Sequence, residues 1–226
     1  MKKIIVYIIL LILPIINSAS INEFDANQID NSDLYVSMKL ADVGLNSKVF
    51  TIAMRGLKKL ENKGKLKNAS IITIVDYSQS SNKKRLYVID LKNEKLLYNS
   101  YVAHGKNSGE EFAKFFSNEE GSLKSSLGFY ITQQTVIGAT TGFALMINGV
   151  EKGFNNNAVK RSIIIHAAEY ATEKFIKKNG RLGRSHGCPA LPPELNKPII
   201  ETIKDGTCLF IYNPDNSYMH NSLFVN

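Results

Sequence analysis

The sequence predicts a mainly-β domain with a few peripheral helices. The first observation is a series of short runs rich in β-branched and aromatic residues, separated by turn residues, which is the pattern of strands. The second is that only three stretches show the apolar spacing of a helix. The third is an apolar fraction of 44% in 226 residues, which supplies the core of one domain and excludes long disorder.

The N-terminus has the pattern of an export signal. Lys2 and Lys3 precede the apolar run Ile4–Ile16, and small residues follow around Ala19. We therefore expect residues 1–19 to be a signal peptide, with an uncleaved N-terminal anchor as the alternative. Export would take the protein to the periplasm or cell envelope.

A polar stretch separates this signal from the domain. Residues 20–44 lack apolar periodicity and are interpreted as a leader, so the catalytic or binding domain is expected over residues 45–213. Its first element is a helix over 47–62, because Asn46 or Ser47 can cap the start of this segment. The apolar residues on one helical face are Val49, Phe50, Ala53, Leu57 and Leu60.

Strands dominate the rest of the domain. Six runs before residue 167 and one near the C-terminus are strand candidates, and the run from Ile71 to Tyr77 is both apolar and rich in β-branched side chains. The turn residues Lys92-Asn93-Glu94 separate the second and third runs and predict a hairpin. The predicted strands are 71–77, 85–91, 95–103, 128–132, 143–148, 162–166 and 207–212.

Two further helices are predicted in the C-terminal half. Helical spacing covers residues 168–178 and residues 193–204, and the second of these stretches starts with a proline. Pro198 lies inside that second stretch and should kink the helix or mark its true start. Residues 214–226 carry no clear pattern and are interpreted as a C-terminal tail.

The chain is basic, with 28 Lys+Arg against 20 Asp+Glu and a net charge of +8. Removal of the signal would take away two lysines and leave the chain basic. An exported basic protein meets anionic polymers and lipid head groups, so peripheral association with the wall or the membrane fits this charge. The lysines are scattered and no nucleic-acid motif is present, so nucleic acid is not an expected partner. Nothing in the sequence indicates an oligomeric state.

Two of the four histidines lie near a cysteine. His166 ends an apolar run, and the string Ser185-His186-Gly187-Cys188 follows a segment rich in Gly and Arg. A cysteine nucleophile needs a base, because a free thiol of pKa about 8.5 is mostly protonated at neutral pH. It also needs N–H groups for the oxyanion, and those of Gly187 and Cys188 are candidates. Spacing alone leaves open whether His166 or His186 is the base.

Two alternatives use the same residues. In an exported protein Cys188 and Cys208 could form a disulfide, which would make the chain a non-catalytic wall-binding module. We expect a buried free thiol at Cys208, since pairing would remove the nucleophile. His166, Glu169, His186 and Cys188 are residue types that bind zinc, but their spacing matches no common zinc pattern, and no metal is predicted.

The segments Ser162–His166 and Gly180–Ala190 resemble the signature of the YkuD-type L,D-transpeptidases, in which a histidine precedes Ser/Thr-His-Gly-Cys. The Gly-Cys-Pro-Ala ending is similar to that of the branch called the murein L,D-transpeptidase catalytic domain family. Pro189 and Ala190 stand where the best-studied members usually carry an arginine and an asparagine. The likeness covers roughly residues 45 to 213. Further blocks that resemble this branch are Val102–Gly109, Phe116–Asn118, Gly121–Gly128 and Gly149–Gly153.

The resemblance implies a sandwich-like catalytic fold and an enzyme without cofactors that acts on peptidoglycan stem peptides. Cys188 would attack the amide after the third stem residue, D-alanine would leave, and the acyl group would pass to an amine. By position, His166 would be the base, oriented by a backbone carbonyl near Ala167. His186, Gly187 and Cys188 would shape the oxyanion hole.

Four residues are candidates for substrate contact. Arg181 and Arg184 precede the cysteine motif, and a guanidinium binds a carboxylate through two parallel hydrogen bonds. Ser185 begins the motif, and His104, next to Gly105, would line the cleft. If water instead of an amine reaches the acyl-enzyme, the same site would act as a peptidoglycan carboxypeptidase or amide hydrolase. The sequence leaves both outcomes open.

Overall fold

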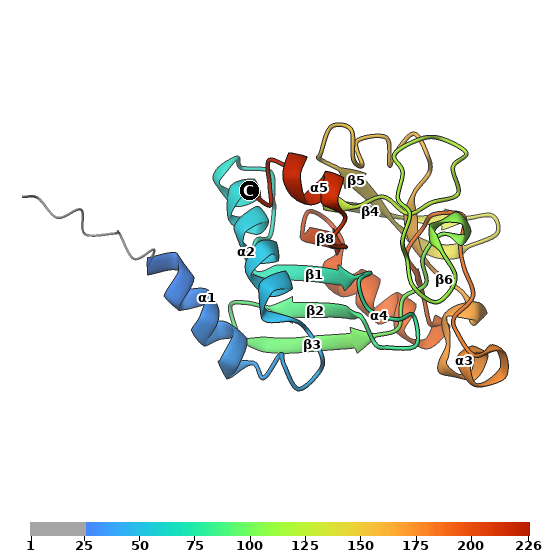
Figure 1. Ribbon diagram of the computed structural model, residues 1–226, viewed down its shortest axis with the longest axis horizontal. Coiled ribbons are helices and arrows are strands. Elements are labelled where there is room, and N and C mark those ends of the chain that lie inside the picture. The colour runs from blue at the N-terminus through green and yellow to red at the C-terminus, as the bar shows by residue number, and fades with distance from the viewer. Residues whose placement is uncertain (1–25) are drawn as a thin grey trace, which may run out of the picture.

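The structure is a computed structural model, and it describes residues 26–226 (Figure 1). The expected signal peptide and the first residues of the leader lie outside the described residues. Over the part of the chain that is described, no helix combines the length and the apolar character that a membrane span requires.

One eight-stranded sheet forms the centre of the molecule (Figure 1). Its strands are β1 (Ile71–Asp76), β2 (Leu86–Asp90), β3 (Lys95–Ser100), β4 (Gly128–Gly138), β5 (Gly142–Gly149), β6 (Ile164–Ala167), β7 (Ala190–Leu191) and β8 (Cys208–Tyr212). Their order in the sheet is β3-β2-β1-β8-β4-β5-β6-β7. The pairs β1–β8 and β6–β7 are parallel, and the other neighbours are antiparallel. The predicted mainly-β class is confirmed.

The two edges of this sheet meet. Just after β3, the Ala103 N–H donates to the Ala190 carbonyl of β7 at 2.9 Å, and the Ala190 N–H donates back at 3.3 Å. A second bridge joins Gly105 to Ser185. The sheet is therefore nearly closed like a barrel, which brings its two halves into sandwich-like layers. We call residues 102–105 the closing segment, because they lie between the two edges.

Helices lie around the sheet (Figure 1). They are α1 (Ala26–Ser37), α2 (Ser47–Asn62), α3 (Glu173–Asn179), α4 (Pro193–Ile203) and α5 (Asn216–Asn221), with short 3₁₀ turns η1 (Lys106–Ser108) and η2 (Glu169–Ala171). As predicted, Asn46 caps α2, since its Oδ1 accepts the Lys48 N–H at 2.9 Å. Pro198 lies inside α4, which starts at Pro193 as predicted.

α2 packs closely on the sheet because it carries a glycine at the contact. A Cβ added to Gly56 would lie 2.0 Å from Cζ of Phe129 in β4. The Phe129 ring in turn stacks on Phe210 of β8, with ring centroids 4.1 Å apart. Helix and sheet therefore share one aromatic core.

Three elements differ from the sequence-based expectation. The helix predicted over 168–178 is divided into η2 and α3, because Thr172 caps the second part with its Oγ1, which accepts the Phe175 N–H at 3.2 Å. β4 continues beyond residue 132 to Gly138, since its polar outer half pairs with β5. The two-residue strand β7 was not predicted; backbone pairing with β6 and Ala103 defines it.

The expected leader and tail both contribute structure. α1 lies within the leader, and the Tyr35 hydroxyl donates to the Leu45 carbonyl at 2.6 Å. α5 lies within the tail, where Tyr218 and Phe224 are buried. The Tyr218 hydroxyl donates to the buried carboxylate of Glu151 at 2.9 Å. Residues 214–226 are thus packed on the domain through large apolar side chains. The sequence did not predict this packing, because polar residues separate these side chains along the segment.

Candidate active site

The loop that carries Cys188 is held by its own polar atoms and by one neighbouring serine. Ser185 Oγ accepts the Gly187 N–H at 3.0 Å and donates to the Cys188 carbonyl at 2.6 Å. Ser125 Oγ donates to the Gly187 carbonyl at 3.1 Å. Gly187 has a φ of +128°, and a Cβ there would lie 2.9 Å from the Lys124 carbonyl oxygen. Only glycine fits this loop without strain.

Cys188 is a free thiol that is partly exposed. Its Sγ lies 3.9 Å from the Ser162 carbonyl, which precedes β6. Burial raises the pKa of the Cys188 thiol, while the Ile164 N–H and the charge of Arg161 act in the opposite direction. At neutral pH the resting side chain is therefore a thiol, and its use as a nucleophile requires a base that accepts the proton.

His166 lies on β6, beside the short strand β7 that follows the cysteine loop. It pairs with Ala190 across the two strands, and its N–H donates to the Pro189 carbonyl at 3.4 Å. The ring Nδ1 donates to the Ala167 carbonyl at 2.9 Å, because a carbonyl oxygen only accepts. This leaves Nε2 as the ring nitrogen that is available for a further partner. From the resemblance, a backbone carbonyl near Ala167 was expected to orient the imidazole, and the Ala167 carbonyl contacts Nδ1.

The other residues of the motif have different surroundings. Ser185 was expected to contact substrate, but it is 4% exposed and binds atoms of its own loop. The Gly187 N–H, a predicted oxyanion donor, is used by Ser185 Oγ. Over residues 26–226 the Cys188 N–H donates to no other residue, so it is the available donor of the two. His186 is exposed to solvent.

His104 does not line a cleft, and that expectation is wrong. Its exposed fraction is 0%, and both ring nitrogens have partners. Nδ1 accepts from the Arg85 guanidinium at 2.8 Å, and Nε2 donates to the Gly109 carbonyl at 3.2 Å. Burial and the charge of Arg85 lower the pKa of His104 to about 3. His104 is therefore a neutral residue of the closing segment, and its buried side chain has a structural role.

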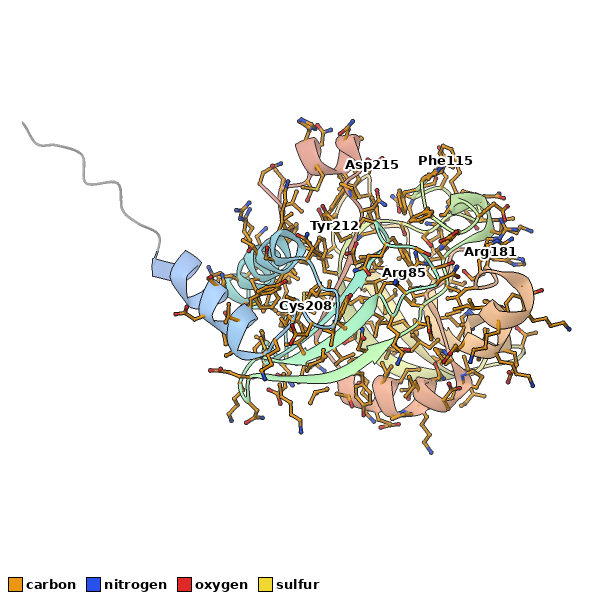
Figure 2. All side chains as sticks on the ribbon, turned by 60° about the horizontal axis from the view of Figure 1, so that its bottom comes forward. Arg85, Phe115, Arg181, Cys208, Tyr212 and Asp215 are labelled. Atoms are coloured by element: carbon orange, nitrogen blue, oxygen red, sulfur yellow. The ribbon has the colours of Figure 1, made fainter. Side chains whose placement is uncertain are left out.

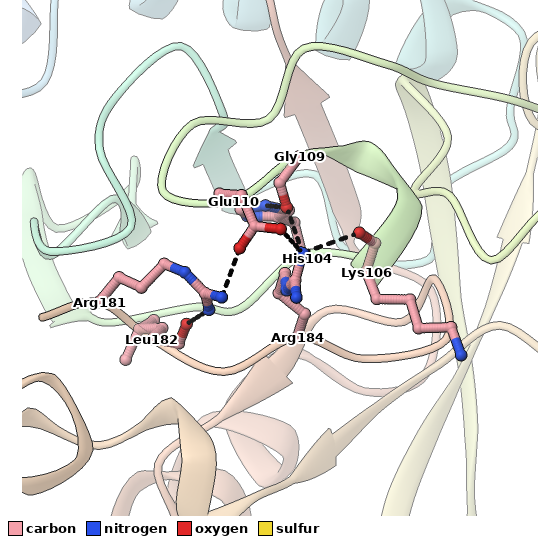
Figure 3. Close-up of polar contacts among 7 residues, drawn as sticks. All are labelled: His104, Lys106, Gly109, Glu110, Arg181, Leu182 and Arg184. Atoms are coloured by element: carbon pink, nitrogen blue, oxygen red, sulfur yellow. Dashed lines mark hydrogen bonds and ion pairs between the residues drawn. The ribbon is translucent and has the colours of Figure 1, made fainter. Parts of the chain in front are cut away.

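Arg181 and Arg184 converge on one carboxylate of the protein itself, that of Glu110 (Figure 3). Arg184 Nη1 lies 2.6 Å from Glu110 Oε1, and Arg181 pairs with the other oxygen. Backbone carbonyls fix both guanidinium groups, for example that of Leu182 at 2.8 Å from Arg181. The arginine side chains are 28% and 25% exposed, against 67% for Glu110. The arginines are thus preorganised, and the carboxylate is the more exposed partner.

Arg85 is a further residue beneath the site that the sequence analysis missed. It lies in the middle of the molecule, whereas Arg181 lies towards one side (Figure 2). Its Nη2 donates to the Val102 carbonyl at 3.0 Å, and its guanidinium lies 4.8 Å from the ring centroid of Tyr77. The Tyr77 hydroxyl donates to the Ala103 carbonyl at 3.1 Å. Together they hold the closing segment; a single arginine ahead of a strand gives no sequence signal of this burial.

The two cysteines are both free, so the disulfide between Cys188 and Cys208 is not formed. Cys208 is buried in β8, as expected, and burial raises its pKa. Within residues 26–226, no group of three or more His, Cys, Asp or Glu side chains is arranged to hold a metal ion.

Residues 41–212 match the family model described as the L,D-transpeptidase catalytic domain. The chain therefore belongs to this family of catalytic domains. The expected resemblance is confirmed by this match, which covers the sheet and the loop with Cys188 and His166 alike.

Solved structures give more distant likenesses. An L,D-transpeptidase from Mycobacterium smegmatis is 12% identical, with 64% of this chain and 59% of that chain covered and a TM-score of 0.41. The helical cell shape determining protein Pgp2 (K307A mutant) from Campylobacter jejuni is 17% identical, with 74% and 54% covered and a TM-score of 0.42. The present chain thus spans less than two thirds of each of these solved chains. No curated protein sequence matches it.

Proposed function

We propose that this protein is an exported L,D-transpeptidase that acts on peptidoglycan stem peptides through a thioacyl-enzyme at Cys188. The observation that carries the proposal is the pairing of β6 with the strand after the cysteine loop. This pairing supports the proposal because a histidine whose ring is oriented through Nδ1 lies on the strand beside the one that follows a free, partly exposed thiol. Membership of the L,D-transpeptidase catalytic domain family supports the substrate class.

The reaction follows from the protonation states. As Cys188 Sγ attacks the carbonyl carbon of the amide after the third stem residue, its proton passes to Nε2 of His166. The Cys188 N–H donates to the oxyanion. The imidazolium then gives its proton to the nitrogen of the departing D-alanine, and a thioester remains. An acceptor amine attacks the thioester, passes its proton to His166, and releases the thiol with a new amide bond formed.

A substrate carboxylate would bind at Arg181 and Arg184, in exchange for Glu110. An exposed ion pair contributes little to stability, about 0–1 kcal/mol, so its exchange for another carboxylate costs little. The fixed guanidinium groups favour a planar carboxylate bound through parallel hydrogen bonds. The expected signal peptide and the basic charge support action on an anionic polymer in the periplasm or cell envelope.

The test is turnover of muropeptides that carry a tetrapeptide stem, analysed by mass spectrometry. The chain from residue 20 onward should release the terminal D-alanine and exchange it for an added D-amino acid. Cys188→Ala should abolish both products, and Cys208→Ala, which removes the buried thiol instead, should retain them. Full turnover by the Cys188→Ala variant would refute the proposal. Release without exchange would assign the carboxypeptidase outcome to the same site.

A further inference from the structure

Arg161 is a half-buried cation that has no anionic partner among residues 26–226. It lies just before β6, and its guanidinium donates to the carbonyls of Ser117 at 2.7 Å and Lys124 at 2.6 Å. The hydroxyls of Ser126 and Ser122 each lie 3.3 Å from it. None of the ion pairs found over residues 26–226 includes Arg161. Withdrawal of a charge from water is costly unless an opposite charge compensates it, so this arrangement calls for an explanation.

The Arg161 guanidinium lies against the loop of the nucleophile. Its Nη2 is 3.4 Å from the point where a Cβ on Gly187 would stand, and the Lys124 carbonyl that it binds is 2.9 Å from the same point. Gly187 precedes Cys188 directly. The Arg161 guanidinium therefore lies beside the position that precedes the thiol, and no side chain at Gly187 intervenes.

Arg161 also differs in charge from the other groups around the thiol. In the described part of the chain, the phenols of Tyr77 and Tyr170 also interact with Cys188, and His166 lies on the strand beside β7. Burial raises the pKa of both phenols, so they are neutral at physiological pH. Arg161 is thus the permanent positive charge among them, and it acts to lower the pKa of Cys188.

We propose that Arg161 is a positioning residue that holds a permanent positive charge beside Cys188 and stabilises the negative charge formed there. When the thiol proton passes to His166, the sulfur becomes a thiolate. This anion supplies the negative charge that compensates the charge of the Arg161 guanidinium. The inference rests on the proposed function, because it assigns a role within that site. The competing explanation is that Arg161 only ties the loop at residues 117–126 to β6.

Two variants separate charge from structure. Arg161→Gln removes the charge and keeps two hydrogen-bond donors, whereas Arg161→Lys keeps the charge and loses the forked geometry. Lys160→Gln is the matched control, because it removes the same charge from the neighbouring residue, whose side chain is 73% exposed. The readout is the rate at which iodoacetamide alkylates Cys188 between pH 6 and pH 10, followed by intact mass. Thermal unfolding checks that each variant is folded.

The proposal predicts that Arg161→Gln raises the apparent pKa of Cys188 by about one unit, which slows alkylation near neutral pH about tenfold. Arg161→Lys should lie within about threefold of the wild type, and Lys160→Gln should leave the profile unchanged. A folded Arg161→Gln variant with the wild-type profile would overturn the proposal. If Arg161→Gln does not fold, Arg161→Lys provides the test. A rise of about one unit in the apparent pKa of Cys188 in this variant, although the charge is retained, would also overturn the proposal.

The same measurement keeps this inference apart from the proposed function. Alkylation needs no muropeptide, so the wild-type pH profile is obtained whether or not the chain turns over a stem peptide. A displaced profile in Arg161→Gln together with no turnover by the wild type would support the role of Arg161 and refute the proposed function. Turnover by the wild type with an undisplaced profile would refute only the role of Arg161.

Discussion

At the scale of single residues, His104 illustrates how position determines what a histidine does. It shares a chain with His166, and both have a ring nitrogen bound to a backbone carbonyl. In His104 the second nitrogen is also occupied, by the Arg85 guanidinium, and the neighbouring charge opposes protonation. Within residues 26–226, no such cation is bound to Nε2 of His166. The same residue type is therefore a fixed neutral support in one place and, in the proposed function, the proton acceptor in the other.

The low pKa of His104 predicts an acid-sensitive fold. Its folded pKa of about 3 lies below the unfolded value of about 6.5. Between these values the unfolded chain binds a proton that the folded chain does not, so stability falls as pH falls through this window. One such group contributes a slope of up to about 1.4 kcal/mol per pH unit. His104→Gln should remove this slope in urea unfolding measured from pH 7 to pH 4.

The exposed His220 supplies the control for that measurement. His220→Gln should retain the acid sensitivity of the wild type, because its side chain lies at the surface of α5. Identical slopes in the wild type and in His104→Gln would contradict the assignment of the acid sensitivity to His104.

Local sequence was sufficient for some of the candidate site. The Ser-His-Gly-Cys motif and the strand that ends at His166 could each be predicted, because each is short and contiguous. Spacing left open which histidine is the base, and only the resemblance indicated His166. Arg181 and Arg184 bind the carboxylate of Glu110, and their contact with a substrate carboxylate stays a prediction. Their partner Glu110 could not be foreseen, because it lies 71 positions from Arg181 in the sequence.

At the scale of elements, the contact of α2 with the sheet depends on Gly56. Gly56→Ala should lower the free energy of unfolding by about 1–3 kcal/mol, because the added methyl group would overlap the Phe129 ring. Alanine has the higher helix propensity, by about 1 kcal/mol, and this gain opposes only part of the loss. The comparison is Glu61→Ala on the exposed face of the same helix, measured by urea unfolding. A Gly56→Ala variant as stable as Glu61→Ala would contradict the packing described.

Elements with strong local signals were predicted well, and the others were not. α2 has a cap and a regular apolar face, and the hairpin of β2 and β3 has turn residues between two runs that contain large apolar side chains. In contrast, β7 comprises only Ala190 and Leu191, and its strand character comes from its neighbours. α1 is too polar for its period to be visible. Such elements depend on tertiary contacts, which a single sequence does not display.

At the scale of the whole molecule, the C-terminal segment joins α2 to the sheet (Figure 1). The Arg55 guanidinium on α2 donates to the Val225 carbonyl at 2.6 Å. The Phe224 ring lies 5.5 Å from that of Phe129, centroid to centroid. These contacts explain why a segment expected to be a tail is packed on the domain.

The C-terminal contact predicts a large difference between adjacent residues. Phe224→Ala should cost about 3–5 kcal/mol of unfolding free energy, because it empties a buried site. Leu223→Ala removes a side chain that is 82% exposed, so it should change stability by less than about 0.5 kcal/mol. Chemical denaturation of the two variants in parallel measures the difference. Equal stability of the two variants would show that the segment does not contribute to the core.

Because the closing segment contacts the loop with Cys188, the site forms only when separate parts of the chain have folded together. Ala103, Ser125 and Arg161 come from separate parts of the chain, and all contact the loop of residues 185–190. A short peptide with the Ser-His-Gly-Cys motif would lack every one of these neighbours, and its sulfur would react like that of any free cysteine. Chemical selectivity in this protein is thus acquired only when the middle and last thirds of the polypeptide have come together.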